Sequence, residues 1–278
     1  MLPTLVPPIK CQGIKTKLIP FIQSTLDWDG EGTWYEPFLG SGVVLFNVCP
    51  KHAVVSDRNK YIIDFYRCVQ DGTITPQSMR FFLEEESPKL ESGGVDYYNE
   101  VRSRFNEEHS PYDLIFLNRS CFNGIMRFNK RGAFNVPFCK KPNRFSKAYI
   151  TKICNQIQHV KDVMEGMDWK FISCDWRETI QLPKKGDCVY LDPPYIGRDT
   201  NYVGEWPEEE AVDLARASHE TEALVYLSMW KENKYRVNQH IPECWSDFEC
   251  HEFSHFYHVG SKESLRNAMT EALLVSPH

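Results

Sequence analysis

The sequence predicts an α/β fold with a mostly parallel sheet, interrupted by one inserted subdomain. Short apolar runs bounded by turn residues alternate with stretches of helical period, which is the pattern of strands and crossover helices. Of the 278 residues, 42% are apolar, which is enough for one substantial core. The third observation is a basic segment in the middle of an otherwise acidic chain.

The part of the chain before this segment predicts three helices and two strands. Its helices are expected where apolar residues recur every three or four positions, and its strands where short apolar runs lie between turn residues. In order, we expect a helix over residues 14–26, a strand over 33–37, a helix over 41–49, a strand over 52–56 and a helix over 60–70.

The inserted subdomain is expected over residues 72–147. From residue 76 to about 122 the period is helical, with an apolar face that includes Tyr98, Val101 and Phe105. Residues 123–142 are punctuated by glycine and proline and carry single apolar residues, so a hairpin or an ordered loop is expected there.

The α/β alternation resumes after the insertion. Residues 1–71 and 148–278 are therefore expected to form one domain. Its second part predicts a helix over 149–164, strands over 169–173 and 188–191, a helix over 208–218, a strand over 223–228 and an antiparallel pair from 248–259 and 271–275.

Composition and charge exclude several classes of protein. No run approaches the roughly 18 apolar residues of a membrane span, and residues 1–10 lack a secretory signal pattern, so we expect a cytoplasmic protein with no membrane association. The ten cysteines are scattered without a Cys-x-x-Cys motif, which favours reduced, buried thiols over disulfides or a zinc ribbon.

The net charge of -6 hides a basic patch. Between Asp113 and Asp162 there are ten Lys or Arg residues and no acidic residue, so this segment carries +10 and the remainder -6 minus 10, or -16. A basic insertion in an acidic body is typical of a phosphate-binding surface. The alternative is a solvated basic face without a partner.

The segment Glu36-Pro-Phe-Leu-Gly-Ser-Gly42 follows a predicted strand and opens a predicted helix. Gly40 and Gly42 allow a tight turn close to a ligand, and Asp57 stands 17 residues after Gly40 at the end of the next strand, where an acidic residue accepts hydrogen bonds from ribose hydroxyls. A third glycine is missing, which favours a mononucleoside over a dinucleotide. The alternative is a plain strand-to-helix turn with a capping aspartate.

The tetrapeptide Asp192-Pro193-Pro194-Tyr195 follows a predicted strand and offers only hydrogen-bond acceptors to a ligand. Two prolines remove two backbone donors and fix the backbone. An exocyclic amine such as adenine N6 could donate one hydrogen to Asp192 and one to the Pro193 carbonyl, which makes its nitrogen nucleophilic, while Tyr195 stacks on the base. We expect Asp192 to be charged at pH 7 without a shifted pKa.

The order of these segments resembles the Dam-type, alpha-group adenine-N6 DNA methyltransferases over nearly the whole chain. The resemblance extends to residues 8–15, and it is most specific at 118–124 and 134–138, which are similar to the family's DNA-reading hairpin. It implies a Rossmann-like methyltransferase fold with S-adenosyl-L-methionine as cofactor. The cofactor-binding residues that it implies are Cys11, Lys15, Glu36, Phe38, Gly40, Gly42, Asp57, Asp175 and Asp192, although many members carry an aromatic residue at the position of Cys11.

The resemblance also implies that residues 72–147 recognise double-stranded DNA, from which the target adenine is flipped out. Phe122 and Asn123 match positions that fill or probe the vacated stack, and Arg127 matches an arginine that reads guanine. Basic residues nearby are expected to hold phosphates. The full implied DNA-binding set is Arg119, Phe122, Asn123, Arg127, Asn129, Lys130, Arg131, Pro137, Lys140, Lys141 and Arg144.

Within the family, residues 12–17, 139–145 and 255–260 resemble the EcoRV-type branch, which implies GATATC as the site, whereas resemblance to Dam implies GATC. A prokaryotic or phage protein near the nucleoid is implied, with a cognate restriction endonuclease as one option and no obligate protein partner. Two further alternatives stay open. One is a DNA-binding module without catalysis, against which the presence of Asp57 and Asp192 counts. The other is the same chemistry on cytosine N4, against which Asp192 counts, or on structured RNA.

One motif is interpreted as a coincidence. His251-Glu252-Phe253-Ser254-His255 has the spacing of a zinc-peptidase site, which requires a helix. This stretch is rich in residues that favour strands and lies where a closing strand is expected. No metal is therefore expected.

Overall fold

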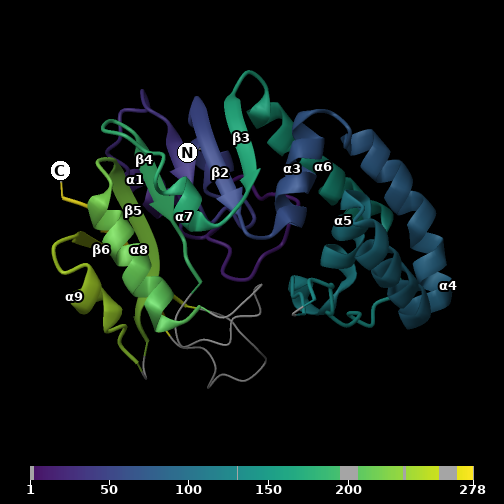
Figure 1. The fold of residues 1–278 in the computed structure, drawn as a ribbon. Coiled ribbons are helices and arrows are strands. Elements are labelled where there is room, and N and C mark those ends of the chain that lie inside the picture. The colour runs from purple at the N-terminus through teal and green to yellow at the C-terminus, as the bar shows by residue number, and fades with distance from the viewer. Residues whose placement is uncertain (1–2, 130, 195–205, 234–235, 257–267, 278) are drawn as a thin grey trace.

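The computed structural model describes residues 3–129, 131–194, 206–233, 236–256 and 268–277, and within them a seven-stranded sheet lies between two layers of helices (Figure 1). The strand order is β3-β2-β1-β4-β5-β7-β6, with the first five strands in that order parallel to one another and β7 antiparallel to both of its neighbours. The strands are β1 Trp34–Glu36, β2 His52–Asp57, β3 Asp168–Ser173, β4 Cys188–Leu191, β5 Leu224–Asn233, β6 Glu249–Phe256 and β7 Ala268–Val275. The predicted α/β fold with a mostly parallel sheet is confirmed.

Helices cover both faces of the sheet. One face packs against the amino-terminal segment, α1, α2, α3 and α6, and the other packs against α7, α8 and α9. The described helices are α1 Ile19–Thr25, α2 Leu45–Val48, α3 Lys60–Gln70, α4 Pro76–Glu108, α5 Pro111–Ser120, the 3-10 turn η1 Phe122–Gly124, α6 Lys147–Met164, α7 Trp176–Thr179, α8 Glu208–Glu220 and α9 His240–Cys244. None of these helices combines the length and the apolar character that crossing a bilayer requires.

Three helices differ from the sequence prediction. The first helix begins at Ile19 rather than at residue 14, with Pro20 in its first turn, where a proline needs no backbone donor. The second begins only at Leu45, because Gly40 and Gly42 hold φ angles of 51° and 73° that interrupt a helix. The stretch from 76 to 122 divides into α4 and α5, since His109 has a φ of 58°.

Residues 123–129 and 131–142 form an ordered loop with isolated bridges rather than a regular hairpin. Two isolated antiparallel bridges pair Cys121 with Phe138 and Phe128 with Phe134. The ring of Phe134 is buried and meets the edge of Phe105 from α4, with ring centroids 6.1 Å apart. The loop is therefore fixed to the inserted helices by an aromatic contact.

The amino-terminal segment is fastened to α5. The Asn118 side chain accepts a hydrogen bond from the Lys10 amide and donates one to the Lys10 carbonyl, each 2.9 Å long. The side-chain amide of Asn118 thus bonds both the N–H and the C=O of Lys10, as a residue of a neighbouring β-strand would do. Residues 8–15 consequently lie between the inserted helices and the sheet.

The sequence His251-Glu252-Phe253-Ser254-His255 lies within β6, as expected. Residues four apart in a strand are separated by about 13 Å along the chain direction, too far for two ligands of one zinc ion. The two histidines thus lack the helical spacing that the peptidase motif requires.

The helix α4 is interrupted at Gly94, whose φ of 54° is not helical, and a buried ion-pair cluster joins the parts before and after Gly94 to α5. Arg104 lies 2.5 Å from Asp113 and 3.1 Å from Glu86, and these two carboxylates are only 1% and 3% exposed. Removing one member of such a cluster leaves a buried charge uncompensated. The inserted helices therefore depend on this arginine.

We predict that Arg104→Met lowers the free energy of unfolding by about 3 kcal/mol, because two buried carboxylates lose their shared cation. Urea denaturation monitored by circular dichroism measures the change. Arg80→Met removes an exposed pair with Glu84 on the same helix and should cost less than about 1 kcal/mol. Equal losses in the two variants would contradict the assignment.

Candidate active site

The candidate residues meet at the carboxyl edge of the sheet, between β1 and β4. Glu36 is the last residue of β1, and Asp192 directly follows β4, which pairs with β1. Asp57 ends β2 on the other side of β1. The chain order of the strands reverses between β1 and β4, and ligands of open α/β sheets bind outside the strand ends at such a point.

The loop after β1 is held against Asp57. The backbone N–H of Gly40 donates to one carboxylate oxygen of Asp57 and that of Asn59 to the other, each at 2.8 Å. Burial raises the pKa of Asp57, and these two hydrogen bonds oppose the rise. A Cβ atom added at Gly40 would meet no atom within 4 Å, whereas one at Gly42 would lie 2.6 Å from the Phe46 ring. The loop is thus open at Gly40 and tightly packed at Gly42.

Glu36 is a buried carboxyl group beside this loop. Its side chain accepts a hydrogen bond of 3.1 Å from the Trp34 indole and is 2% exposed. Burial raises its pKa to about 8, although the indole hydrogen bond counteracts this. Because its pKa is about 8, Glu36 is close to changing its charge at neutral pH.

Phe38, two residues after Glu36, stacks on Trp176 with ring centroids 6.2 Å apart.

Asp192, whose side chain is 24% exposed, forms an ion pair with the buried Lys15. The Lys15 ammonium lies 2.9 Å from Asp192 Oδ1, and Lys15 is 3% exposed. Burial raises the pKa of Asp192, while Lys15 lowers it, so the expectation of an unshifted pKa was wrong. Burial alone would lower the pKa of Lys15, but Asp192 and Glu271 raise it above its usual value. Lys15 is consequently a permanent cation.

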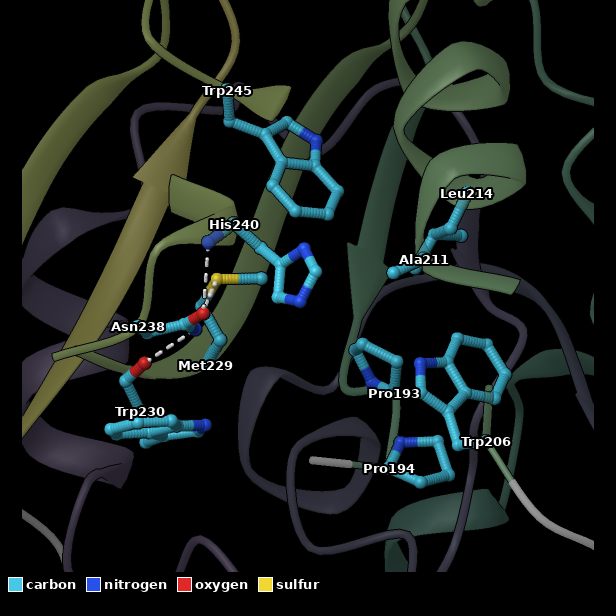
Figure 2. Close-up of a pocket in the computed structure, with 10 residues that line it drawn as sticks. All are labelled: Pro193, Pro194, Trp206, Ala211, Leu214, Met229, Trp230, Asn238, His240 and Trp245. Carbon is cyan, nitrogen blue, oxygen red and sulfur yellow. Dashed lines mark hydrogen bonds between the residues drawn. The ribbon is translucent and has the colours of Figure 1, made fainter. Parts of the chain in front are cut away.

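Pro193 and Pro194 line a small apolar cavity together with residues of β5, α8 and α9 (Figure 2). Its volume is about 20 Å³, which is room for a water molecule and not for a nucleobase. Asn238 donates a hydrogen bond of 2.9 Å to the carbonyl of Trp230 in β5. The residues lining the cavity are Pro193, Pro194, Trp206, Ala211, Leu214, Met229, Trp230, Asn238, His240 and Trp245. Tyr195 lies outside the described residues.

Two of the expected cofactor residues are Asp175, which is bonded within the protein, and Cys11, which is uncharged. Asp175 caps α7 and accepts a hydrogen bond of 2.7 Å from Arg58 Nε, and Arg58 Nη2 donates to Glu210 of α8 at 3.3 Å. Burial would raise the pKa of Asp175, but the Arg177 amide and Arg58 hold it below its usual value. Cys11 is half-buried, and its pKa is raised by burial and by nearby carboxylates, so it is a neutral thiol.

Most of the expected DNA-binding side chains lie on the surface of the segment that the sequence predicts to be an inserted subdomain. Phe122 is 52% exposed, and Asn123 next to it has a φ of 55°. Asn129 has a local role as well, because its side-chain oxygen accepts backbone hydrogen bonds within the loop. Exposed members of the set are Phe122, Asn123, Asn129, Arg131, Pro137, Lys140 and Lys141, while Lys130 lies outside the described residues.

Three arginines of the expected set form hydrogen bonds to other residues of the protein. Arg119 is 3% exposed and donates to the Pro8 carbonyl and, at 2.5 Å, to Gln156, so the structure places it in the core and not on a DNA-binding surface. Arg144 is partly exposed and donates to the Arg119 carbonyl. Arg127 is also partly exposed, and it bonds Asn135 at 2.9 Å.

Two groups of residues at the site escaped the sequence analysis. Arg58 and Glu210 surround Asp175, and Glu271 adds a buried carboxyl group near Lys15. The sequence holds a signal for Glu271, because this acidic residue directly precedes the apolar run Ala272–Val275 in the same strand. That strand, β7, lies between β5 and β6. Arg58 and Glu210 carry no comparable signal in the sequence.

Comparison with known proteins gives a consistent set of relatives. Residues 12–259 match the family model described as D12 class N6 adenine-specific DNA methyltransferase. The type II methyltransferase M1.LlaDCHI of Lactococcus lactis subsp. cremoris is 26% identical over 98% of this chain and 95% of its own length. A DNA adenine methylase of Haemophilus influenzae is 29% identical over 66% and 62%, and the type II methyltransferase M.MjaIII of Methanocaldococcus jannaschii is 30% identical over 68% of both chains.

We predict that Glu36→Gln stabilises the protein increasingly as the pH rises from about 4.5 to 8. The pKa of Glu36 is raised from 4.5 to about 8 in the folded chain, so the wild type loses stability over this window and the amide does not. Above pH 8 the gain is on the order of 5 kcal/mol, because each unit of pKa shift corresponds to about 1.4 kcal/mol. Thermal unfolding at a series of pH values measures it. A difference that is constant with pH would refute the assigned shift.

Proposed function

Because the chain belongs to the D12 class of N6 adenine-specific DNA methyltransferases, we propose that it transfers a methyl group from S-adenosyl-L-methionine to N6 of an adenine in double-stranded DNA. The observation that carries this proposal is the position of Asp192 and Pro193. They follow β4 at the carboxyl edge of the sheet, beside Glu36 and Asp57.

The residues around the loop after β1 fit the chemical groups of this cofactor. The open space at Gly40 admits a ligand against the backbone, and the Asp57 carboxylate is of the kind that accepts hydrogen bonds from a ribose diol. Glu36 supplies an acidic group for an α-ammonium. When bound, the cofactor supplies an electrophilic methyl group on a sulfonium.

The tetrapeptide would make the amine nucleophilic. Lys15 occupies Oδ1 of Asp192, so Oδ2 is the oxygen available to an amino hydrogen. The Pro193 carbonyl would accept the second hydrogen, and both acceptors together favour a localised lone pair on nitrogen. A stacked adenine cannot reach a recessed carboxylate, so we expect it to be flipped out of the duplex. Tyr195 would stack on the flipped base.

The inserted subdomain, residues 72–147, supplies the surface that we propose for DNA. Its exposed Arg131, Lys140 and Lys141 suit phosphates, while Phe122 is an exposed aromatic side chain that could enter a vacated base stack. Arg127 could read guanine once released from Asn135. Arg119 is left out of this surface because it is buried.

The recognised site that we propose is GATATC or a GATC-type sequence, in a cytoplasmic protein that accompanies a restriction endonuclease. The name type II methyltransferase, borne by the relatives from Lactococcus lactis and Methanocaldococcus jannaschii, supports the restriction-modification role. Sequencing that detects modified adenines in a plasmid carrying the gene tests base, position and context together. Modification confined to cytosine would overturn the proposal.

We predict that Asp192→Asn lowers the rate of methyl transfer to duplex DNA at least about a hundredfold, since the amine loses its charged acceptor. Incorporation of labelled methyl groups measures the rate, and a gel-shift assay should show little change in DNA affinity. Asp213→Asn alters an exposed ion pair on α8 and should keep full activity. Full activity of Asp192→Asn would remove the basis of the proposed chemistry.

We predict that Lys140→Ala together with Lys141→Ala weakens DNA binding at all sequences and lowers the slope of log affinity against log salt by about 1.8, because each lost phosphate contact contributes about 0.9. Fluorescence anisotropy at several salt concentrations measures the slope. The matched control is Lys184→Ala with Lys185→Ala, a second pair of exposed lysines, which precedes β4 at the opposite edge of the sheet. The same slope for wild type and the first variant would contradict the proposed surface.

A further inference from the structure

One side chain of α3 contacts both a helix of residues 72–147 and the loop that follows these helices. Tyr61 lies in the first turn of α3, and α3 lies between the sheet and the helices α4 and α5 (Figure 1). We name residues 125–129 and 131–138 the bridged loop, because isolated bridges pair Cys121 with Phe138 and Phe128 with Phe134. At Tyr61 the part of the chain that carries the candidate active site meets the bridged loop.

The Tyr61 ring stacks on the ring of Phe128. Their centroids are 5.1 Å apart, and the ring planes are inclined by only 23°. Stacked rings at this distance attract each other beyond the effect of the apolar area that they bury. The Tyr61 hydroxyl also donates a hydrogen bond of 3.4 Å to the carbonyl of Gly132, which lies between Phe128 and Phe134. Tyr61 thus contacts the bridged loop at two points.

The same ring also packs against α4. It lies edge-on to Phe105 with ring centroids 5.0 Å apart, and its centroid is 5.1 Å from that of the His109 ring. Phe105 is 1% exposed and in turn meets Phe134 of the bridged loop. A ring with close neighbours on several sides has few alternative positions in a packed interior. Contacts with α4 consequently hold Tyr61 in the place where it supports Phe128.

Side chains of the bridged loop alternate between two faces around Phe128. Met126 and Phe128 are buried, whereas Arg127 is partly exposed and Asn129 is exposed. This alternation is that of an extended strand, in which neighbouring side chains point to opposite faces. The inward contact of Phe128 with Tyr61 therefore sets the direction in which Arg127 and Asn129 point outward.

Tyr61 is built on the turn that carries Asp57. The Asn59 amide donates to Asp57 at 2.8 Å, and the Asn59 side chain accepts a hydrogen bond of 3.2 Å from the Tyr61 amide. The other carboxylate oxygen of Asp57 accepts the hydrogen bond from Gly40 in the loop after β1. A continuous set of hydrogen bonds thus connects the loop after β1 with the residue that supports Phe128.

We propose that Tyr61 is a positioning residue that holds the bridged loop, through Phe128, in the place from which Arg127 reads the DNA sequence. Tyr61 touches no base in this scheme. It governs which base pairs are accepted and not the chemistry at Asp192. The effect on sequence choice rests on the proposed function, whereas the position of the bridged loop is a property of the free protein.

The first test measures amide hydrogen exchange in the free protein by NMR. The amides of Asn129 and Asn135 donate to carbonyl groups within the bridged loop. In Tyr61→Leu we expect these two amides to exchange at least about ten times faster, because local opening no longer breaks the ring contact. Amides of β2 are the internal reference and should keep their rates. Unchanged exchange in the bridged loop, or an equal acceleration in β2, would overturn the proposal.

Two further variants separate the ring contact from other effects. Tyr61→Phe keeps the ring, so the bridged loop should exchange nearly as slowly as in the wild type. The matched control is Tyr112→Leu, since Tyr112 is also a partly buried tyrosine, with its ring 5.3 Å from that of Phe82 and its hydroxyl 3.1 Å from the Thr73 carbonyl. This control should leave exchange in the bridged loop unchanged. Fast exchange in either variant would contradict the role assigned to the Tyr61 ring.

The second test measures the choice of sequence. It compares kcat/KM for methyl transfer between a duplex with the site found by sequencing and duplexes changed at one base pair of that site. Tyr61→Leu should lower this ratio about tenfold at the base pair that Arg127 reads, since one bidentate contact to guanine contributes discrimination of this order. The fraction of folded protein cancels in the ratio. A ratio equal to that of the wild type at every base pair would overturn the proposal.

A double-mutant cycle tests whether Tyr61 acts through Phe128. Phe128→Leu should lower the same ratio, and the double variant should lose less than the product of the two single losses, because residues in contact are non-additive. Losses that multiply would contradict action through Phe128. A wild type that transfers no methyl group to any duplex would refute the proposed function, and hydrogen exchange would still decide whether Tyr61 positions the bridged loop.

Discussion

The ion pair between the buried Lys15 and the partly exposed Asp192 is the interaction on which the geometry of the site depends. Lys15 is 3% exposed, whereas the Asp192 side chain is 24% exposed, so it is the buried ammonium that most needs its partner. The pair also joins two distant parts of the chain, since Lys15 precedes α1 and Asp192 follows β4. Because the two prolines after Asp192 restrict the backbone, the carboxylate is fixed from both sides.

The order of strands and helices could be predicted from the sequence because each element carries its own local pattern. The run Cys188–Leu191 is predicted at its observed bounds, and the closing antiparallel pair is placed correctly. Helix starts were less predictable, since they depend on single residues. Gly42 delays α2 through its positive φ, which apolar periodicity does not reveal.

The residues of the candidate site could be predicted where they belong to a sequence motif. They could not be predicted where their role depends on a contact with a distant part of the chain. Glu36, Asp57 and Asp192 meet at one edge of the sheet because parallel strands end there together. Arg119 shows the opposite case. It stands in a basic stretch of sequence, yet its guanidinium is buried against the Pro8 carbonyl, so a sum of charges overstates the positive surface.

The bonds between the amino-terminal segment and α5 give the first residues of the chain an unexpected importance. Lys10 is tied to Asn118, and five residues later Lys15 reaches Asp192. A short, bonded connection therefore runs from the inserted helices to the carboxylate. A protein shortened by fifteen residues at its amino terminus would keep every strand of the sheet and lose both ends of that connection at once.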